Sequence, residues 1–277
     1  MATIVHPTRF FRESDMHQPE LIDVAGGHIV AFSKTCPGKT EPNDDSALVI
    51  SLSADRFVMA VADGVGGAPL GYKASAIAIE CLAETLSESF AGAGDAVVDQ
   101  LDLRPAILDG IEKANAEILD LGTGSATTLS IVEVNHRIAR GYQVGDSMML
   151  FVGGRGAIKW KSTSHSPVGY AVQAGLMDEE DAMYHDERHL VSNLVGSREM
   201  HIEIGPAINL SARDTIVVGS DGLFDNLHTN EVVQRCRIGK PGRRMEELVR
   251  LATDRMHGED DALPGKFDDL TILLLTP

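Results

Sequence analysis

The order of strand-like and helical patterns constrains the fold of this chain more than any other feature of its sequence. Grouped strands favour antiparallel sheets covered by helices over a parallel sheet in which strands and helices alternate. Apolar, β-rich runs, which are typical of strands, come in groups at 27–62, 126–162 and 201–219, with one more at 269–276. Apolar residues three or four positions apart, which are typical of a buried helix face, come in pairs of segments, at 74–86 and 107–118, then at about 229–237 and 243–257.

Composition narrows the class of protein. The 277 residues are 43% hydrophobic, enough for a large core, and the net charge of -17 opposes binding to nucleic-acid phosphate. Three scattered cysteines without a CxxC pattern argue against a disulfide framework and against a thiolate zinc site. The sequence shows neither a signal-peptide pattern nor a membrane-spanning apolar run. We therefore expect a cytoplasmic monomer with no membrane partner, built from an N-terminal arm or edge strand (1–26) and a single domain (27–277).

Aspartate-rich turns mark the ends of the predicted strands. They are PNDDS at 42–46, VADGVGG at 61–67, VGDS at 144–147, GSDGLFDN at 219–226 and KFDDLT at 266–271. Each lies beside a strongly apolar run, so its aspartate is expected at the edge of a sheet. If several of these edges meet, their carboxylates converge.

Converging carboxylates raise one another's pKa unless cations neutralise them. Hard oxygen ligands without histidine or cysteine favour Mg²⁺ or Mn²⁺ over Zn²⁺. A pair of such ions can activate water for attack at phosphorus. The residue types therefore indicate metal-assisted hydrolysis of a phosphate ester, although spacing alone does not show that the turns meet.

Ordinary turn chemistry is the competing interpretation, because aspartate and glycine both accept the backbone angles of tight turns. Other glycine-rich motifs do not fit. Gly71 is followed by Tyr72 rather than by the Lys-Ser/Thr of a phosphate-binding loop, and Pro69 stands where a dinucleotide fingerprint needs glycine. No GxSxG nucleophile motif occurs.

Taken together, the motifs VADGVGG, GDS, SDGLFD and DDLT resemble, in their order, those of the PPM family of PP2C-like Ser/Thr protein phosphatases. The resemblance covers about residues 27–276 and is greatest to the bacterial and organellar branch with DGVGG and SDGLFDN. It implies an α+β fold, a four-layer α-β-β-α sandwich of two antiparallel sheets flanked by helix pairs.

The resemblance also implies two Mn²⁺ or Mg²⁺ ions at one end of the sandwich. Asp63 would bridge both ions, and the carbonyl of Gly64 would help to bind one of them. Asp221 and Asp268 would hold the first ion. Asp44 replaces the usual glutamate and would reach the second ion through water, so that Asp63 and Asp44 are the expected catalytic residues.

Four further aspartates have less direct roles in this comparison. Asp146 and Asp225 match positions that hold a third, weaker ion in several bacterial members. Asp45 and Asp269 are expected to support the ligands, and Asp269 is the alternative to Asp268 as a ligand.

Two positions depart from the family pattern. Thr40 stands where many members have a phosphate-binding arginine, so the neighbouring Lys39 is the candidate for this role, with an exposed loop lysine as the alternative. Val65 replaces a histidine that protonates the leaving alcohol in animal members. His165 is a conceivable donor, but we expect it to be a hydrogen-bonded structural residue.

The resemblance predicts that a hydroxide between the ions attacks phosphoserine or phosphothreonine in one step, without a phospho-enzyme. The substrates would be phosphoproteins made by a Ser/Thr kinase. Two alternatives stay open: a non-catalytic binding module with this fold, and a phosphatase for a small phosphorylated molecule.

Overall fold

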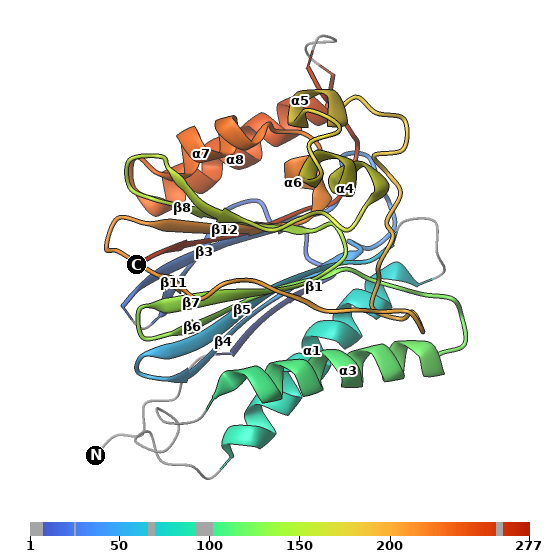
Figure 1. The fold of residues 1–277 in the computed structure, drawn as a ribbon, viewed down its shortest axis with the longest axis vertical. Coiled ribbons are helices and arrows are strands. Elements are labelled where there is room, and N and C mark those ends of the chain that lie inside the picture. The colour runs from blue at the N-terminus through green and yellow to red at the C-terminus, as the bar shows by residue number, and fades with distance from the viewer. Residues whose placement is uncertain (1–7, 25, 66–69, 92–101, 259–262) are drawn as a thin grey trace.

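The computed structural model describes residues 8–24, 26–65, 70–91, 102–258 and 263–277. These residues form two antiparallel sheets that lie face to face, with helices on the outer side of each sheet (Figure 1). The arrangement confirms the predicted four-layer α-β-β-α sandwich.

The first sheet joins segments from the N-terminus to the middle of the chain. In spatial order its strands are β1 (Thr8–Arg12), β4 (Asp45–Ser53), β5 (Arg56–Asp63), β6 (Leu129–Asn135), β7 (Ile138–Val144) and β10 (Glu203–Ile204). The short strand β11 (Ile208–Asn209) also pairs with β7.

The second sheet combines the other N-terminal strands with the C-terminal half. In spatial order its strands are β2 (Glu20–Val24), β3 (Gly27–Lys34), β13 (Leu270–Thr276), β12 (Thr215–Gly219), β8 (Met148–Val152) and β9 (Ile158–Lys161). Residues 8–24 therefore supply an edge strand to each sheet.

Side-chain alternation along the strands creates three apolar layers. In β4, Leu48 packs toward the helices and Val49 toward the second sheet. In β13, Leu273 packs between the sheets and Ile272 toward the outer helices. All four side chains are buried, because a strand between two covered faces buries successive residues on opposite sides.

Two pairs of helices cover the sandwich, as the periodicity predicted. The helices are α1 (Gly71–Phe90) and α3 (Leu103–Asp120) on the first sheet, and α7 (Thr229–Cys236) and α8 (Pro241–Met256) on the second. Helix α8 starts two residues earlier than predicted because Pro241 occupies its first turn, where the missing N–H costs nothing. Among the described helices, none combines the length and apolarity that crossing a membrane requires.

The segment 163–200, which we call the flap, has no clear periodicity in the sequence. It contains two short helices, α4 (Pro167–Gln173) and α5 (Glu179–Ala182), joined by loops. Both helices lie at the same end of the molecule as the one-turn helix α6 (Asp221–Phe224) (Figure 1). The predicted turn at 219–226 is therefore a helical turn.

The strand connections bring the acidic segments to this end. Asp45, the first residue of β4, pairs with Asp63, the last residue of β5. In the second sheet, Gly219 at the end of β12 pairs with Ile272 near the start of β13. Asp221 thus follows one strand while Asp268 precedes its antiparallel neighbour. The topology supplies the convergence that sequence spacing could not.

Candidate active site

One group of carboxylates surrounds the ammonium of Lys266. Its Nζ lies 3.0 Å from Asp268 Oδ2 and 3.2 Å from Asp225 Oδ2, and it also forms an ion pair with Asp221. The other carboxylate oxygen of Asp221, Oδ1, is buried and has no hydrogen-bond partner. This group therefore consists of one lysine and three aspartates, and one carboxylate oxygen of Asp221 still lacks a hydrogen-bond donor.

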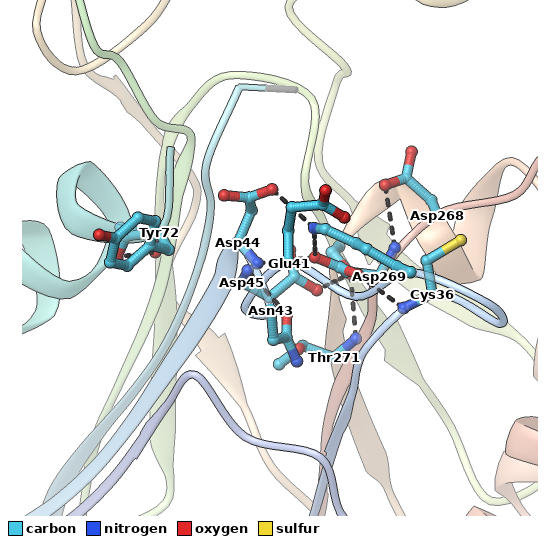
Figure 2. Close-up of polar contacts among 12 residues, drawn as sticks. Cys36, Glu41, Asn43, Asp44, Asp45, Tyr72, Asp268, Asp269 and Thr271 are labelled. Atoms are coloured by element: carbon cyan, nitrogen blue, oxygen red, sulfur yellow. Dashed lines mark hydrogen bonds and ion pairs between the residues drawn. The ribbon is translucent and has the colours of Figure 1, made fainter. Parts of the chain in front are cut away.

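A second group includes Asp44 and Asp269 (Figure 2) and surrounds the ammonium of Lys39. Lys39 Nζ donates to Asp44 Oδ2 at 2.7 Å and to Asp269 Oδ2 at 2.6 Å. Asp269 also accepts the backbone N–H groups of Asp44 and Cys36, each at 2.6 Å. Asp269 thus fixes the loop that carries Asp44, which agrees with the supporting role expected for it.

Asp45 and Asp63 lie at neighbouring strand ends in the first sheet. Asp45 is buried and accepts a hydrogen bond from Ser220 Oγ at 2.8 Å, which links the two sheets. The backbone of Asp63 is held on both sides, because its N–H donates to Thr128 Oγ1 at 3.0 Å and its carbonyl accepts from Thr127 Oγ1 at 2.8 Å. The Asp63 carboxylate is therefore presented from a rigid strand end.

Asp63 is coupled electrostatically to several of the buried aspartates at this end of the molecule. Burial raises the pKa of Asp63 well above its usual range, and the carboxylates of Asp221, Asp45, Asp268 and Asp146 raise it further. Burial likewise raises the pKa of Asp268 to about 6, with Asp221 as the next cause. Such mutual repulsion in a buried place favours the binding of cations.

Asp146 joins this site from the loop between β7 and β8. Burial raises its pKa, and the carboxylates of Asp221 and Asp225 add to the effect. The preceding Gly145 has a φ of +100° and donates its N–H to His165 Nδ1 at 3.1 Å. The left-handed backbone at Gly145 and the contact with His165 therefore position Asp146.

His165 has the structural character that the sequence suggested. Its side chain is fully buried, and Nδ1 also accepts a hydrogen bond from Asn193 Nδ2 at 2.8 Å. Nε2 lies 3.1 Å from Glu203 Oε2. Both ring nitrogens are therefore engaged, and burial lowers the pKa of the imidazole.

Close packing explains the glycines that follow two of the aspartates. A Cβ atom on Gly64 would lie 2.3 Å from the carbonyl oxygen of Gly71 and 2.8 Å from that of Asp44. A Cβ atom on Gly222 would lie 2.0 Å from the carbonyl oxygen of Asp269. Neither glycine has a positive φ. The Asp-Gly pairs thus reflect close backbone approach rather than the unusual turn angles of the competing interpretation.

The donor set fits hard divalent cations, although in the described part of the chain no three acidic, histidine or cysteine side chains already stand in metal-site geometry. The ammonium groups of Lys39 and Lys266 pair with the carboxylates instead. The unpartnered Asp221 Oδ1 and the raised pKa values of Asp63 and Asp268 both indicate a site short of positive charge. Carboxylate and carbonyl oxygens are the preferred ligands of Mg²⁺ and Mn²⁺.

Comparison with known families identifies the chain. Residues 34–255 match the family model described as protein phosphatase 2C. The chain belongs to this family of PPM protein phosphatases. Its assignment as an enzyme rests on this membership and on the acidic site.

Known PPM phosphatases share most of their length with this chain. Protein phosphatase PhpP of Streptococcus pneumoniae serotype 2 is 26% identical over 232 residues, which are 80% of this chain and 87% of PhpP. The PPM Ser-Thr phosphatase MsPP from Mycobacterium smegmatis, solved with cacodylate, has a TM-score of 0.70 and 25% identity, covering 89% of this chain and 97% of MsPP. The catalytic domain of serine threonine protein phosphatase PstP, solved with two manganese ions, has a TM-score of 0.66 and 21% identity and covers 90% and 96%. The PstP comparison supports the fold.

A cavity of about 640 Å³ opens beside the acidic site of the phosphatase. Its lining includes Asp146, Asp221 and Asp225, together with Arg188 from the flap and Lys161 from β9. Lys161 forms an ion pair with Glu179 of the flap. The cavity therefore lies between the carboxylates and the flap.

Sequence reasoning did not find Lys266, and it placed Asp45 only in a supporting role. Lys266 touches three of the predicted ligands, and the Asp45 carboxylate contributes to the raised pKa of Asp63. A lysine two residues before the Asp268-Asp269 pair was the available signal for Lys266. The sequence could not predict where the Lys266 side chain points, because this depends on the contacts of its loop.

Proposed function

We propose that this PPM phosphatase hydrolyses phosphoserine and phosphothreonine in proteins in a reaction that requires two Mn²⁺ or Mg²⁺ ions. The convergence of Asp44, Asp63, Asp221 and Asp268 at one end of the sandwich carries this proposal. Family membership supports protein dephosphorylation, and the oxygen-only donor set supports the choice of metals. The substrates would be phosphoproteins made by a Ser/Thr kinase.

The ligands would divide between the two groups of carboxylates. Asp221 and Asp268 would hold one ion, and Asp44 would reach the other through water. The carbonyl of Gly64 would help to bind one of the ions, and Asp63 would reach both. Asp146 and Asp225 are the candidates for a third, weaker ion. When bound, such ions polarise the phosphoryl oxygens and lower the pKa of water.

Lys39 is the proposed contact for the substrate phosphate. It lies beside Asp44 at the edge of the site, and its side chain is 20% exposed. Two carboxylates hold its ammonium, and they raise the pKa of Lys39 against the opposing effect of burial. Lysine offers a point charge rather than the two-pronged contact of arginine, so we expect weaker phosphate binding than an arginine at position 40 would give.

The cavity beside the acidic site is the proposed place for the protein chain that flanks the phosphorylated residue. It adjoins Asp146 and Asp221, and residues of the flap line it. Its volume of about 640 Å³ falls within the range of about 300–1,000 Å³ for ligand pockets. Flap residues would then contact the substrate next to its phosphate.

Hydrolysis of a phosphopeptide with Mn²⁺, with and without EDTA, tests the proposal. We expect turnover only with the metal, and a loss of at least about 100-fold in kcat for Asp63→Asn, since the loss of one preorganised electrostatic contact costs about 10²–10³. Asp109→Asn is the matched control, because Asp109 is exposed on α3 and the charge change is the same. Metal-independent turnover, or full activity of the Asp63 variant, would contradict the proposal.

The same measurements separate the two alternatives. A non-catalytic binding module would show no turnover with any phosphorylated substrate, even when Mn²⁺ is bound. A phosphatase for small molecules would hydrolyse a phosphorylated metabolite with a higher kcat/KM than any phosphopeptide in a matched screen.

A further inference from the structure

Lys266 occupies the interior of the group of carboxylates that the proposed function assigns to metal binding. Its ammonium contacts Asp221, Asp225 and Asp268, and only 22% of the side chain is exposed. Each contact is an ion pair with a proposed ligand. An ammonium and a divalent cation on the same carboxylate oxygens would repel each other strongly at such short range.

The backbone of Lys266 is held in place, so its side chain always starts beside the acidic site. The buried side chain of Asn226 donates to Lys266 O at 3.0 Å and accepts from Lys266 N at 2.9 Å. The same amide group donates to Gly222 O at 3.0 Å. Arg188 of the flap donates to the neighbouring Gly265 O at 3.1 Å. The loop is thus tied both to the Asp221–Asp225 turn and to the flap.

We propose that Lys266 is an internal counter-ion that competes with divalent cations for these carboxylates and thereby sets the metal affinity of the site. The inference rests on the proposed function. Before a metal takes the Oδ2 atoms of Asp221 and Asp268, the ammonium must leave them. The contacts of Asn226 keep the loop in place during this exchange, so Lys266 remains close enough to return when the metal dissociates.

Removal of the ammonium should therefore strengthen metal binding. The contribution of one hydrogen bond to a charged group corresponds to about a 10- to 100-fold change in affinity. We expect Lys266→Gln to bind Mn²⁺ about 10- to 100-fold more tightly than the wild type. The variant should also be less stable in EDTA, because its carboxylates lose their counter-ion.

Calorimetric titration of the full chain with Mn²⁺, after removal of metal with EDTA, tests this expectation. Lys113→Gln is the matched control, because Lys113 pairs with Glu84 on the helical layer and its replacement changes the net charge equally. A lower Kd for the Lys266 variant, with an unchanged Kd for the control, supports the competition. An equal or higher Kd for the Lys266 variant overturns it and leaves Lys266 a purely structural residue.

Amine labelling of the wild type gives a second readout that does not depend on how the variant folds. An acylating reagent followed by peptide mapping should modify Lys266 more extensively in Mn²⁺ than in EDTA, and Lys113 equally in both. Labelling of Lys266 that stays constant or falls in Mn²⁺ overturns the inference. If the wild type binds Mn²⁺ and hydrolyses phosphopeptide but Lys266→Gln has an unchanged Kd, only this inference is refuted. If the wild type shows neither metal uptake nor turnover, the proposed function is refuted as well.

Discussion

Replacement of Asp268 by asparagine tests the electrostatics of the acidic site, because it removes one charge and nearly preserves the shape. Burial, and after it the carboxylate of Asp221, raises the pKa of Asp268 from 3.8 to about 6, although Lys266 lowers it. A carboxyl group with a higher pKa in the folded chain binds its proton more tightly there than in the unfolded chain. Its contribution to stability is therefore greatest below pH 3.8 and is lost as the pH rises to about 6.

The size of the effect follows from this pKa. A rise from 3.8 to about 6 corresponds to about 3 kcal/mol at 1.36 kcal/mol per pH unit. The Asp268 side chain is 33% exposed, so solvent screening reduces this value. We expect Asp268→Asn to raise the free energy of unfolding by about 1–2 kcal/mol above pH 7 in EDTA, with Lys266 still paired to Asp221 and Asp225.

Urea unfolding in EDTA at pH 8 and at pH 4.5 measures the effect, with Asp109→Asn as the control of equal charge. The gain should be largest at pH 8 and smaller at pH 4.5, where the folded wild type already carries the proton. Mn²⁺ should stabilise the wild type more than the variant, because the variant has lost a proposed ligand. A variant that is less stable than the wild type at pH 8 in EDTA would refute the reasoning.

Three further substitutions test the packing around the site. Gly64→Ala should destabilise the fold by about 1–3 kcal/mol and weaken Mn²⁺ binding, because its Cβ would meet the Gly71 carbonyl at 2.3 Å; unchanged Mn²⁺ affinity in calorimetry would contradict this. His165→Ala should cost about 2–4 kcal/mol in thermal unfolding, because it leaves a cavity and an unpaired Gly145 N–H; a loss below about 1 kcal/mol would show that the flap does not depend on this contact. Leu82→Ala in α1 should cost about 2–5 kcal/mol with unchanged kcat per folded molecule, and a reduced kcat would show that the helical layer affects the site.

The sandwich could be predicted because burial imposes simple periods on the sequence. A strand covered on both faces needs apolar residues on both sides, as Leu48 and Val49 show in β4. A helix on a sheet needs a stripe with a period near 3.6 residues, as Ala78 and Leu82 show in α1. These local requirements do not depend on which distant segment supplies the partner.

The flap could not be predicted, because its structure does not follow from a local period in the sequence. Helices α4 and α5 have seven and four residues, too few to establish a period. Their place depends on contacts between distant residues. His165, for example, joins Gly145, Asn193 and Glu203, which lie far from it in the sequence.

The site was predictable in its residue types and not in its internal contacts. Strand-end aspartates suggested a metal site, and the family resemblance supplied their convergence. Lys266 was missed because an isolated lysine in a polar loop resembles any exposed lysine. Its position depends on Asn226, which lies 40 residues earlier and clamps its backbone.

At the acidic end of the sandwich, the requirements of a stable fold conflict with those of metal binding. Burial raises the pKa of Asp63 and of its neighbours, so the charged forms needed for metal binding are the forms that destabilise the fold. Lys39 and Lys266 offset part of this charge, but they pair with oxygens of the proposed metal ligands. Substitutions that we expect to stabilise this end, such as Asp268→Asn, would therefore remove proposed ligands. Such a trade-off is expected where a binding site breaks the rules of a stable core. In the proposed competition, Lys266 stabilises the fold before metal binds and weakens the affinity of the site for metal.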